Sequence, residues 1–96
     1  MTIRLLSLAE ADLLAGYHFY ERQSDGVGNY FLDTIYSEIE SLHLYAGIHP
    51  LFAGYFRLVI RRFPYAVYYI IQGKEIQVWR VLDCRKNPKW IARQLE

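Results

Sequence analysis

Hydrophobic residues recur at two different periods along the chain, helical in the first half and strand-like in the second. Residues 2–6 are predicted as a short strand, and residues 7–23 follow as a helix. Ser7 and Glu10 have the spacing of a capping box, in which each side chain satisfies a backbone N–H at the helix start. Apolar side chains recur along this helix at Leu13, Tyr17 and Tyr20. This spacing predicts a first helix that runs to about Gln23.

A second helix is predicted over residues 29–44, after a glycine-containing turn at residues 24–28. Its apolar stripe consists of Phe31, Leu32, Ile35, Ile39 and Leu42. The segment 47–50 ends the helix, and residues 51–54 are predicted as a loop. Because a short turn joins the two helices, we expect them to pack as an antiparallel hairpin.

From residue 55 onward the period changes to that of β-strands. The segment 55–61 alternates, residues 62–64 form a bend, and residues 65–71 are apolar on both faces, as in a central strand. A tight turn at residues 72–75 leads into a last strand over residues 75–83. The connections are so short that these strands must pair as an antiparallel meander.

The chain is predicted to end in a short helix over residues 88–95, with Pro88 early in it and apolar anchors at Trp90, Ile91 and Leu95. The element order is then strand, helix, helix, strand, strand, strand and short helix. We therefore predict one α+β domain over residues 1–96, an antiparallel sheet with the helical hairpin packed on one face.

Composition narrows the class of protein. Apolar residues make up 53% of the chain, which excludes a disordered segment. A net charge of +1 argues against nonspecific nucleic-acid binding, although a local basic patch stays compatible with it. One cysteine, no signal-peptide pattern and no apolar run of membrane-spanning length predict a cytoplasmic protein.

Candidate chemistry is concentrated in the basic residues of the strands and of the segment after them. A single arginine is most simply a solvated or salt-bridged surface residue, but five on one sheet are equally well interpreted as a basic patch that grips phosphates or carboxylates. Arg80 shares its strand parity with Ile76, Val78 and Leu82, so its charged head must reach water or a carboxylate. The candidate residues for contact with a macromolecular target are Arg57, Arg61, Arg62, Arg80, Arg85, Lys86 and Trp90.

Other reactive side chains lack the spacing that a site requires. Asp83 is expected to pair with Arg85 or Arg57 and to fix the strand end, because nothing in the sequence supports a general base there. Cys84 has no evident histidine partner, and the three histidines show no metal-ligand spacing. We therefore expect no metal, no cofactor and no small-molecule substrate.

Three stretches, taken in order, resemble the RelE/ParE superfamily, toxins of type II toxin–antitoxin systems, over nearly the whole chain. Residues 56–58, Phe-Arg-Leu, are similar to the family's strand motif of an aromatic residue followed by Arg-Leu. Residues 65–69 resemble its apolar strand ending in tyrosines. The ParE-like ending Val-Leu-His-Gly-Arg-Arg-Asp-Pro is matched at Val81, Leu82, Arg85 and Pro88, with Lys86 for Arg and Asn87 for Asp.

The resemblance implies one of two activities. RelE-like members cut messenger RNA in the ribosome with basic residues, for which Arg57 and Arg85 are the candidates here, whereas ParE-like members poison DNA gyrase without a ribonuclease site. The departures favour the ParE-like side. Asp83 occupies the position of the family's histidine, and Tyr65 or Ala66 occupies that of a nuclease arginine.

The leading hypothesis is therefore a growth-inhibiting ParE-like toxin, of the kind that serves plasmid stabilization, which binds DNA gyrase and is neutralised by a cognate antitoxin. The antitoxin would lay an amphipathic helix or an extended segment over the hydrophobic groove beside the sheet and helices. Two alternatives stay open: a ribosome-dependent mRNA endoribonuclease of the RelE type, and a degenerate toxin retained as a non-toxic binding module.

Overall fold

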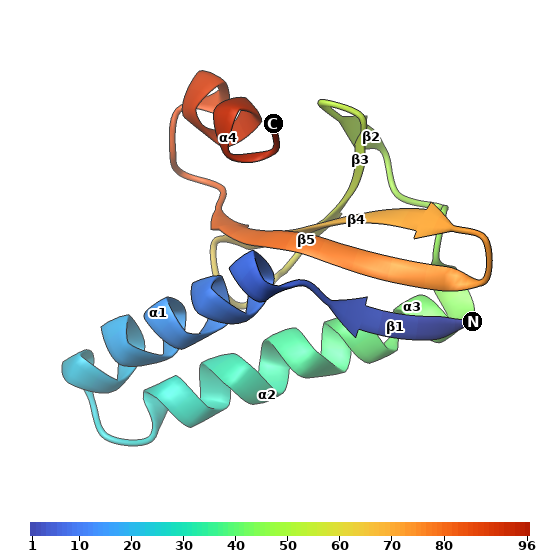
Figure 1. The fold of residues 1–96 in the computed structure, drawn as a ribbon. Coiled ribbons are helices and arrows are strands. Elements are labelled where there is room, and N and C mark those ends of the chain that lie inside the picture. The colour runs from blue at the N-terminus through green and yellow to red at the C-terminus, as the bar shows by residue number, and fades with distance from the viewer.

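A computed structural model describes residues 1–96 as one five-stranded sheet with helices on both faces (Figure 1). The elements are β1 (Thr2–Leu5), α1 (Ser7–Gln23), α2 (Val27–Glu40), α3 (Leu42–Tyr45), β2 (Leu51–Phe52), β3 (Tyr55–Val59), β4 (Tyr65–Gln72), β5 (Glu75–Asp83) and α4 (Pro88–Gln94). The sheet order is β1-β5-β4-β3-β2. The predicted α+β class and antiparallel meander are confirmed, whereas β1 joins the edge of the sheet parallel to β5.

Two glycines let α1 and α2 approach each other closely, as the predicted hairpin requires. A Cβ atom on Gly16 of α1 would lie 2.6 Å from the Phe31 ring of α2. A Cβ atom on Gly28 of α2 would lie 2.7 Å from the backbone oxygen of Tyr17. Both distances are far shorter than van der Waals contact, so each helix carries a glycine where the other helix crosses it.

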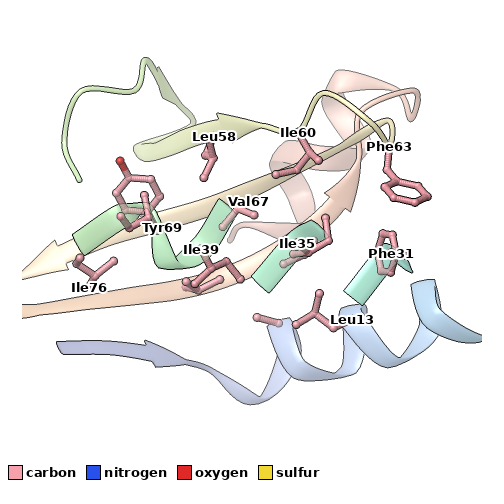
Figure 2. Packing of buried hydrophobic residues seen from close by; sticks show 14 residues of the cluster. Leu13, Phe31, Ile35, Ile39, Leu58, Ile60, Phe63, Val67, Tyr69 and Ile76 are labelled. Carbon is pink, nitrogen blue, oxygen red and sulfur yellow. The ribbon is translucent and has the colours of Figure 1, made fainter. Parts of the chain in front are cut away.

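The main core lies between this hairpin and the sheet (Figure 2). The predicted stripe of α2 faces the sheet, with Phe31, Ile35 and Ile39 fully or almost fully buried. The sheet meets them with alternate residues of β3, β4 and β5, namely Leu58, Val67, Tyr69, Ile76 and Val78. Each fully buried side chain of this size contributes about 1.5–3 kcal/mol, so this layer contact is the main source of stability.

The opposite face of the sheet is partly covered, which the prediction of two layers did not include. α4 lies on that face and packs Ile91 and Leu95 against Ala66, Tyr68 and Leu82 (Figure 1). The predicted anchoring role of the terminal helix is confirmed. The far face of β4 and β5 is therefore a second small core rather than an open surface.

The helix ends differ from prediction for local reasons. α1 begins without a side-chain cap, so the capping box predicted for Ser7 and Glu10 is wrong. α2 begins earlier than predicted because Glu21 at the end of α1 caps it. The Glu21 carboxylate accepts hydrogen bonds from the backbone N–H groups of Gly26 and Gly28, at 2.9–3.1 Å.

The predicted second helix is interrupted near its end. The Ser41 hydroxyl donates to the carbonyl of Glu38, and α3 begins after it as a separate turn. This local bond competes with regular helix geometry. The loop predicted at residues 51–54 contains the short strand β2, which forms a hairpin with β3. No helix of the protein is long and apolar enough to cross a membrane.

A β-bulge in β5 changes which side chains face the main core. Tyr68 pairs with Arg80 and Tyr69 pairs with Val78, so Trp79 is an extra residue between them. Val78 belongs to the main core, whereas Arg80 lies opposite Tyr68 of the second core. The predicted common parity of Arg80 and Val78 is therefore wrong.

Candidate functional site

A groove of about 380 Å³ lies between α1, the C-terminal half of β5 and α4. Ala15 and Gly16 line it from α1. Because Ala15 has only a methyl group and Gly16 has no side chain, they leave the space that the groove occupies. Phe19 and Trp90 add aromatic surface from α1 and α4. Four charged residues complete the lining, so the groove combines apolar area with polar groups that can fix the orientation of a bound segment.

Asp83 and Arg85 form a two-point ion pair beside this groove. Nη2 of Arg85 lies 2.7 Å and Nε 3.1 Å from the Asp83 carboxylate, which also accepts the backbone N–H of Arg85 at 2.8 Å. The hydrogen bonds from Arg85 hold the pKa of Asp83 below its usual value, although partial burial acts in the opposite direction. The predicted pairing of Asp83 with Arg85 is confirmed, and it neutralises much of the guanidinium charge.

Lys86 and Trp90 stand next to that pair. The Lys86 ammonium lies 5.7 Å from the centroid of the Trp90 ring, within cation–π range. Lys86 is exposed and has no carboxylate partner within salt-bridge distance, so its charge is available to a ligand. Three of the predicted contact residues, including Arg85, therefore meet at one groove.

Tyr65 lines the groove from the first residue of β4. Burial, reinforced by Tyr20 and Asp83 nearby, raises the pKa of Tyr65 to about 12. Its hydroxyl therefore stays protonated at neutral pH. It can donate a hydrogen bond to a ligand, but it cannot act as a general base.

Arg80 has an internal partner. Its guanidinium contacts Asp12 at two atoms and reaches the backbone oxygen and side-chain oxygen of Gln94 at 3.3 and 3.4 Å. The Arg80 side chain is only 14% exposed. It therefore joins α1, β5 and α4, and a contact with a target would have to use its small exposed part.

The remaining arginines are distributed over different parts of the surface. Arg57 donates to the hydroxyl of Tyr68, on the side of the sheet that α4 covers. Arg62 bonds instead to the hydroxyl of Tyr30 on α2, and Arg61 is exposed at the bend. The prediction that five arginines on one sheet form a single basic patch is therefore wrong. The bulge and the bend orient these side chains toward different parts of the surface.

A hydrophobic groove beside the sheet and helices was expected from the sequence, but most of the residues that line it were not predicted. Ala15, Gly16 and Phe19 come together with Trp90 only through the packing of the first and the last helices, and none of them belongs to a recognisable motif. The pairing of Asp12 with Arg80 spans 68 positions and has no local signature. No group of three potential metal ligands lies together.

Comparison with known proteins identified a family and a similar solved structure. The family model described as "ParE toxin of type II toxin-antitoxin system, parDE" matches residues 3–88. A chain in the solved structure "Chromosomal ParDE TA system from P. aeruginosa" superimposes with a TM-score of 0.77 and 26% sequence identity, over 84% of this chain and 92% of that chain. The search of curated proteins returned no match.

Proposed function

The chain belongs to the ParE family of toxins of type II toxin–antitoxin systems, and on that basis we propose that it arrests growth by binding DNA gyrase and is neutralised by a cognate antitoxin. The observation that carries the choice of target is the ion pair between Asp83 and Arg85. RNA cleavage needs basic residues that stabilise the strained phosphate, and here a carboxylate already pairs with Arg85, one of the two candidate nuclease arginines. Recognition of a protein surface does not need Arg85 to be free of its carboxylate partner.

The groove supports binding of an antitoxin segment. Its apolar lining suits the apolar face of an amphipathic helix or the alternate side chains of an extended segment. Lys86 at the same groove favours a segment with an acidic residue beside its apolar anchor. Both partners, antitoxin and gyrase, are cytoplasmic, the compartment expected from the sequence.

The test is DNA supercoiling by purified gyrase with and without the protein. We expect inhibition at micromolar protein, and recovery of supercoiling when the antitoxin is added in equimolar amount. Unchanged supercoiling at a large excess of folded protein would overturn gyrase as the target. The antitoxin is tested separately, by its ability to restore growth when both genes are expressed.

An endoribonuclease is the second candidate, because Arg57 remains beside the phenolic hydroxyl of Tyr68 at 3.2 Å. It requires cleavage of ribosome-bound mRNA that weakens in the Arg57→Ala variant. An intact transcript under translation conditions would remove this candidate. Normal growth on overexpression without the antitoxin would instead favour the non-toxic binding module.

A further inference from the structure

The end of the molecule away from the groove carries an exposed apolar surface. Four large side chains on and after α3 are mainly in solvent, with exposed fractions of 81% for Leu44, 51% for Tyr45, 72% for Ile48 and 66% for Leu51. These four residues are referred to as the end patch. Apolar groups gathered on one segment mark interaction surfaces more often than scattered ones do.

The end patch is held on a fixed frame. The backbone N–H of Gly47 donates to the hydroxyl of the buried Tyr69 at 2.9 Å, and Nδ1 of His49 contacts the same hydroxyl at 2.5 Å. The carbonyl of Pro50 accepts the backbone N–H of Arg57. Because the segment is anchored on both sides of Ile48, little conformational entropy is lost when the patch is covered.

The chemistry of the patch indicates what covers it. Residues 41–56 contain no Asp, Glu, Lys or Arg, the longest such stretch in the chain, and the patch lies within it. Such a surface offers no charge complementarity to a charged partner segment. In a two-fold contact between identical copies, a charged group near the axis faces the same group of the other copy and is repelled by it. Such a contact therefore favours a surface without charges. Homodimer interfaces are also the most apolar class of protein interface.

We propose that the end patch is the contact surface of a homodimer, in which Leu44 and Ile48 of two copies meet across a two-fold axis. The patch and the groove lie at opposite ends of β4. Tyr65 at the start of this strand lines the groove, and Ile71 near its end lies against Gly47, beside the patch. The dimer therefore leaves both grooves open, and the proposal does not depend on the identity of the target.

Sedimentation equilibrium of the full-length protein without antitoxin tests the proposal. Four side chains form the centre of a small interface, so we expect a dimer that dissociates reversibly in the micromolar range. The variant Leu44→Glu/Ile48→Glu places four carboxylates in the interface and should raise the dissociation constant at least about a hundredfold. Both positions are solvent-exposed in the monomer, so circular dichroism and thermal stability should be unchanged.

Leu14→Glu is the matched control, because Leu14 is also exposed, at 58%, but lies on α1 outside the patch. It should dimerise as the wild type does. A wild-type protein that stays monomeric at millimolar concentration would overturn the proposal, as would a double variant that dimerises like the wild type. Protection of Leu44 and Ile48 from hydrogen exchange only when the antitoxin is added would overturn it too, and would assign the patch to the antitoxin.

Discussion

The carboxylate of Asp12 on α1 accepts two hydrogen bonds from the guanidinium of Arg80 on β5, with both oxygen–nitrogen distances at 2.8 Å. The same carboxylate accepts the backbone N–H of Val81 at 2.9 Å. Pairing of β1 with β5 ends at Val78. Beyond that residue, the Asp12 carboxylate accepts a backbone N–H of β5 that a neighbouring strand would otherwise satisfy. Both charged side chains are largely buried, with exposed fractions of 13% and 14%.

Replacing Asp12 should therefore be costly. In Asp12→Ala, a buried guanidinium and a backbone N–H lose their partner, and we expect the free energy of unfolding to fall by about 3–5 kcal/mol. Asp12→Asn keeps one acceptor oxygen and should lose less. Denaturation in urea measures both. Arg4→Ala removes the exposed pair with Glu75 and should change stability by less than about 1 kcal/mol, so similar losses in the two alanine variants would contradict this ranking.

The helix crossing gives a second prediction. In Gly28→Ala the new methyl group meets the backbone oxygen of Tyr17, which cannot turn aside as a flexible side chain can. The expected loss is about 1–3 kcal/mol despite the better helix propensity of alanine. Asn29→Ala, at the exposed neighbouring position, also gains helix propensity, though less than Gly28→Ala does, and it introduces no clash. Equal or greater stability of Gly28→Ala in thermal denaturation would show that the helices have room to separate.

The groove should be sensitive to the sign of its charge. Lys86→Glu reverses the free cation beside Trp90, and we expect inhibition of gyrase to weaken at least about tenfold, because acidic groups of the partner are then repelled. Lys74→Glu makes the same charge change at the β4–β5 turn, away from the groove. It should inhibit like the wild type. Equal potency of the two variants in a supercoiling titration would separate the groove from gyrase binding.

Removing the anion at Asp83 should expose the charge of Arg85. Asp83→Asn is expected to bind heparin and short RNA more tightly than the wild type, with elution at higher salt, since one more cation can then contact phosphate or sulfate. Glu75→Gln also removes a carboxylate that pairs with an arginine, and it serves as the control for net charge. Identical elution of both variants would mean that the Asp83 carboxylate does not mask Arg85.

The frame of the end patch should respond to pH. Burial lowers the pKa of His49, with Glu38 acting weakly in the opposite direction. Since the folded state resists protonation of His49, its contribution to stability is complete above the unfolded value of about 6.5 and is lost as the pH falls below it. Unfolding free energies measured from pH 7 to pH 5 should therefore decline more steeply for the wild type than for His49→Asn. Tyr69→Phe, which lacks the hydroxyl that contacts both His49 and Gly47, should lower stability at pH 7; unchanged stability would contradict the anchoring role.

The parts of the fold that local pattern determines were predictable from the sequence. The stripe of α2 and the alternation of β3 are set by hydrophobic period alone, and β5 has its predicted bounds, Glu75 to Asp83. The order of short connections then left an antiparallel meander as the only arrangement. The pairing of Asp83 with Arg85 was also predictable, because the two residues are close in the chain.

The rest depends on contacts between distant segments. The bulge at Trp79 has no sequence signature, yet it moves Arg80 out of the row that contains Val78. The start of α2 depends on hydrogen bonds from its first backbone N–H groups to the Glu21 carboxylate of α1. The second core depends on the position in which α4 packs against the sheet. The groove follows from the same events, so Ala15, Gly16 and Phe19 could not be identified before the packing was known, although Trp90 was among the predicted contact residues.

The parallel alignment of β1 with β5 has a consequence for how the chain is made. β1 is translated before the two long helices and its partner strand after them, so β1 cannot pair until the residues between them have been made. Until Glu75 to Val78 have left the ribosome, the two long helices have no completed layer to cover, and the groove has only one of its sides. The groove is therefore completed only after β5 has been made, and any activity that depends on the groove is delayed until then.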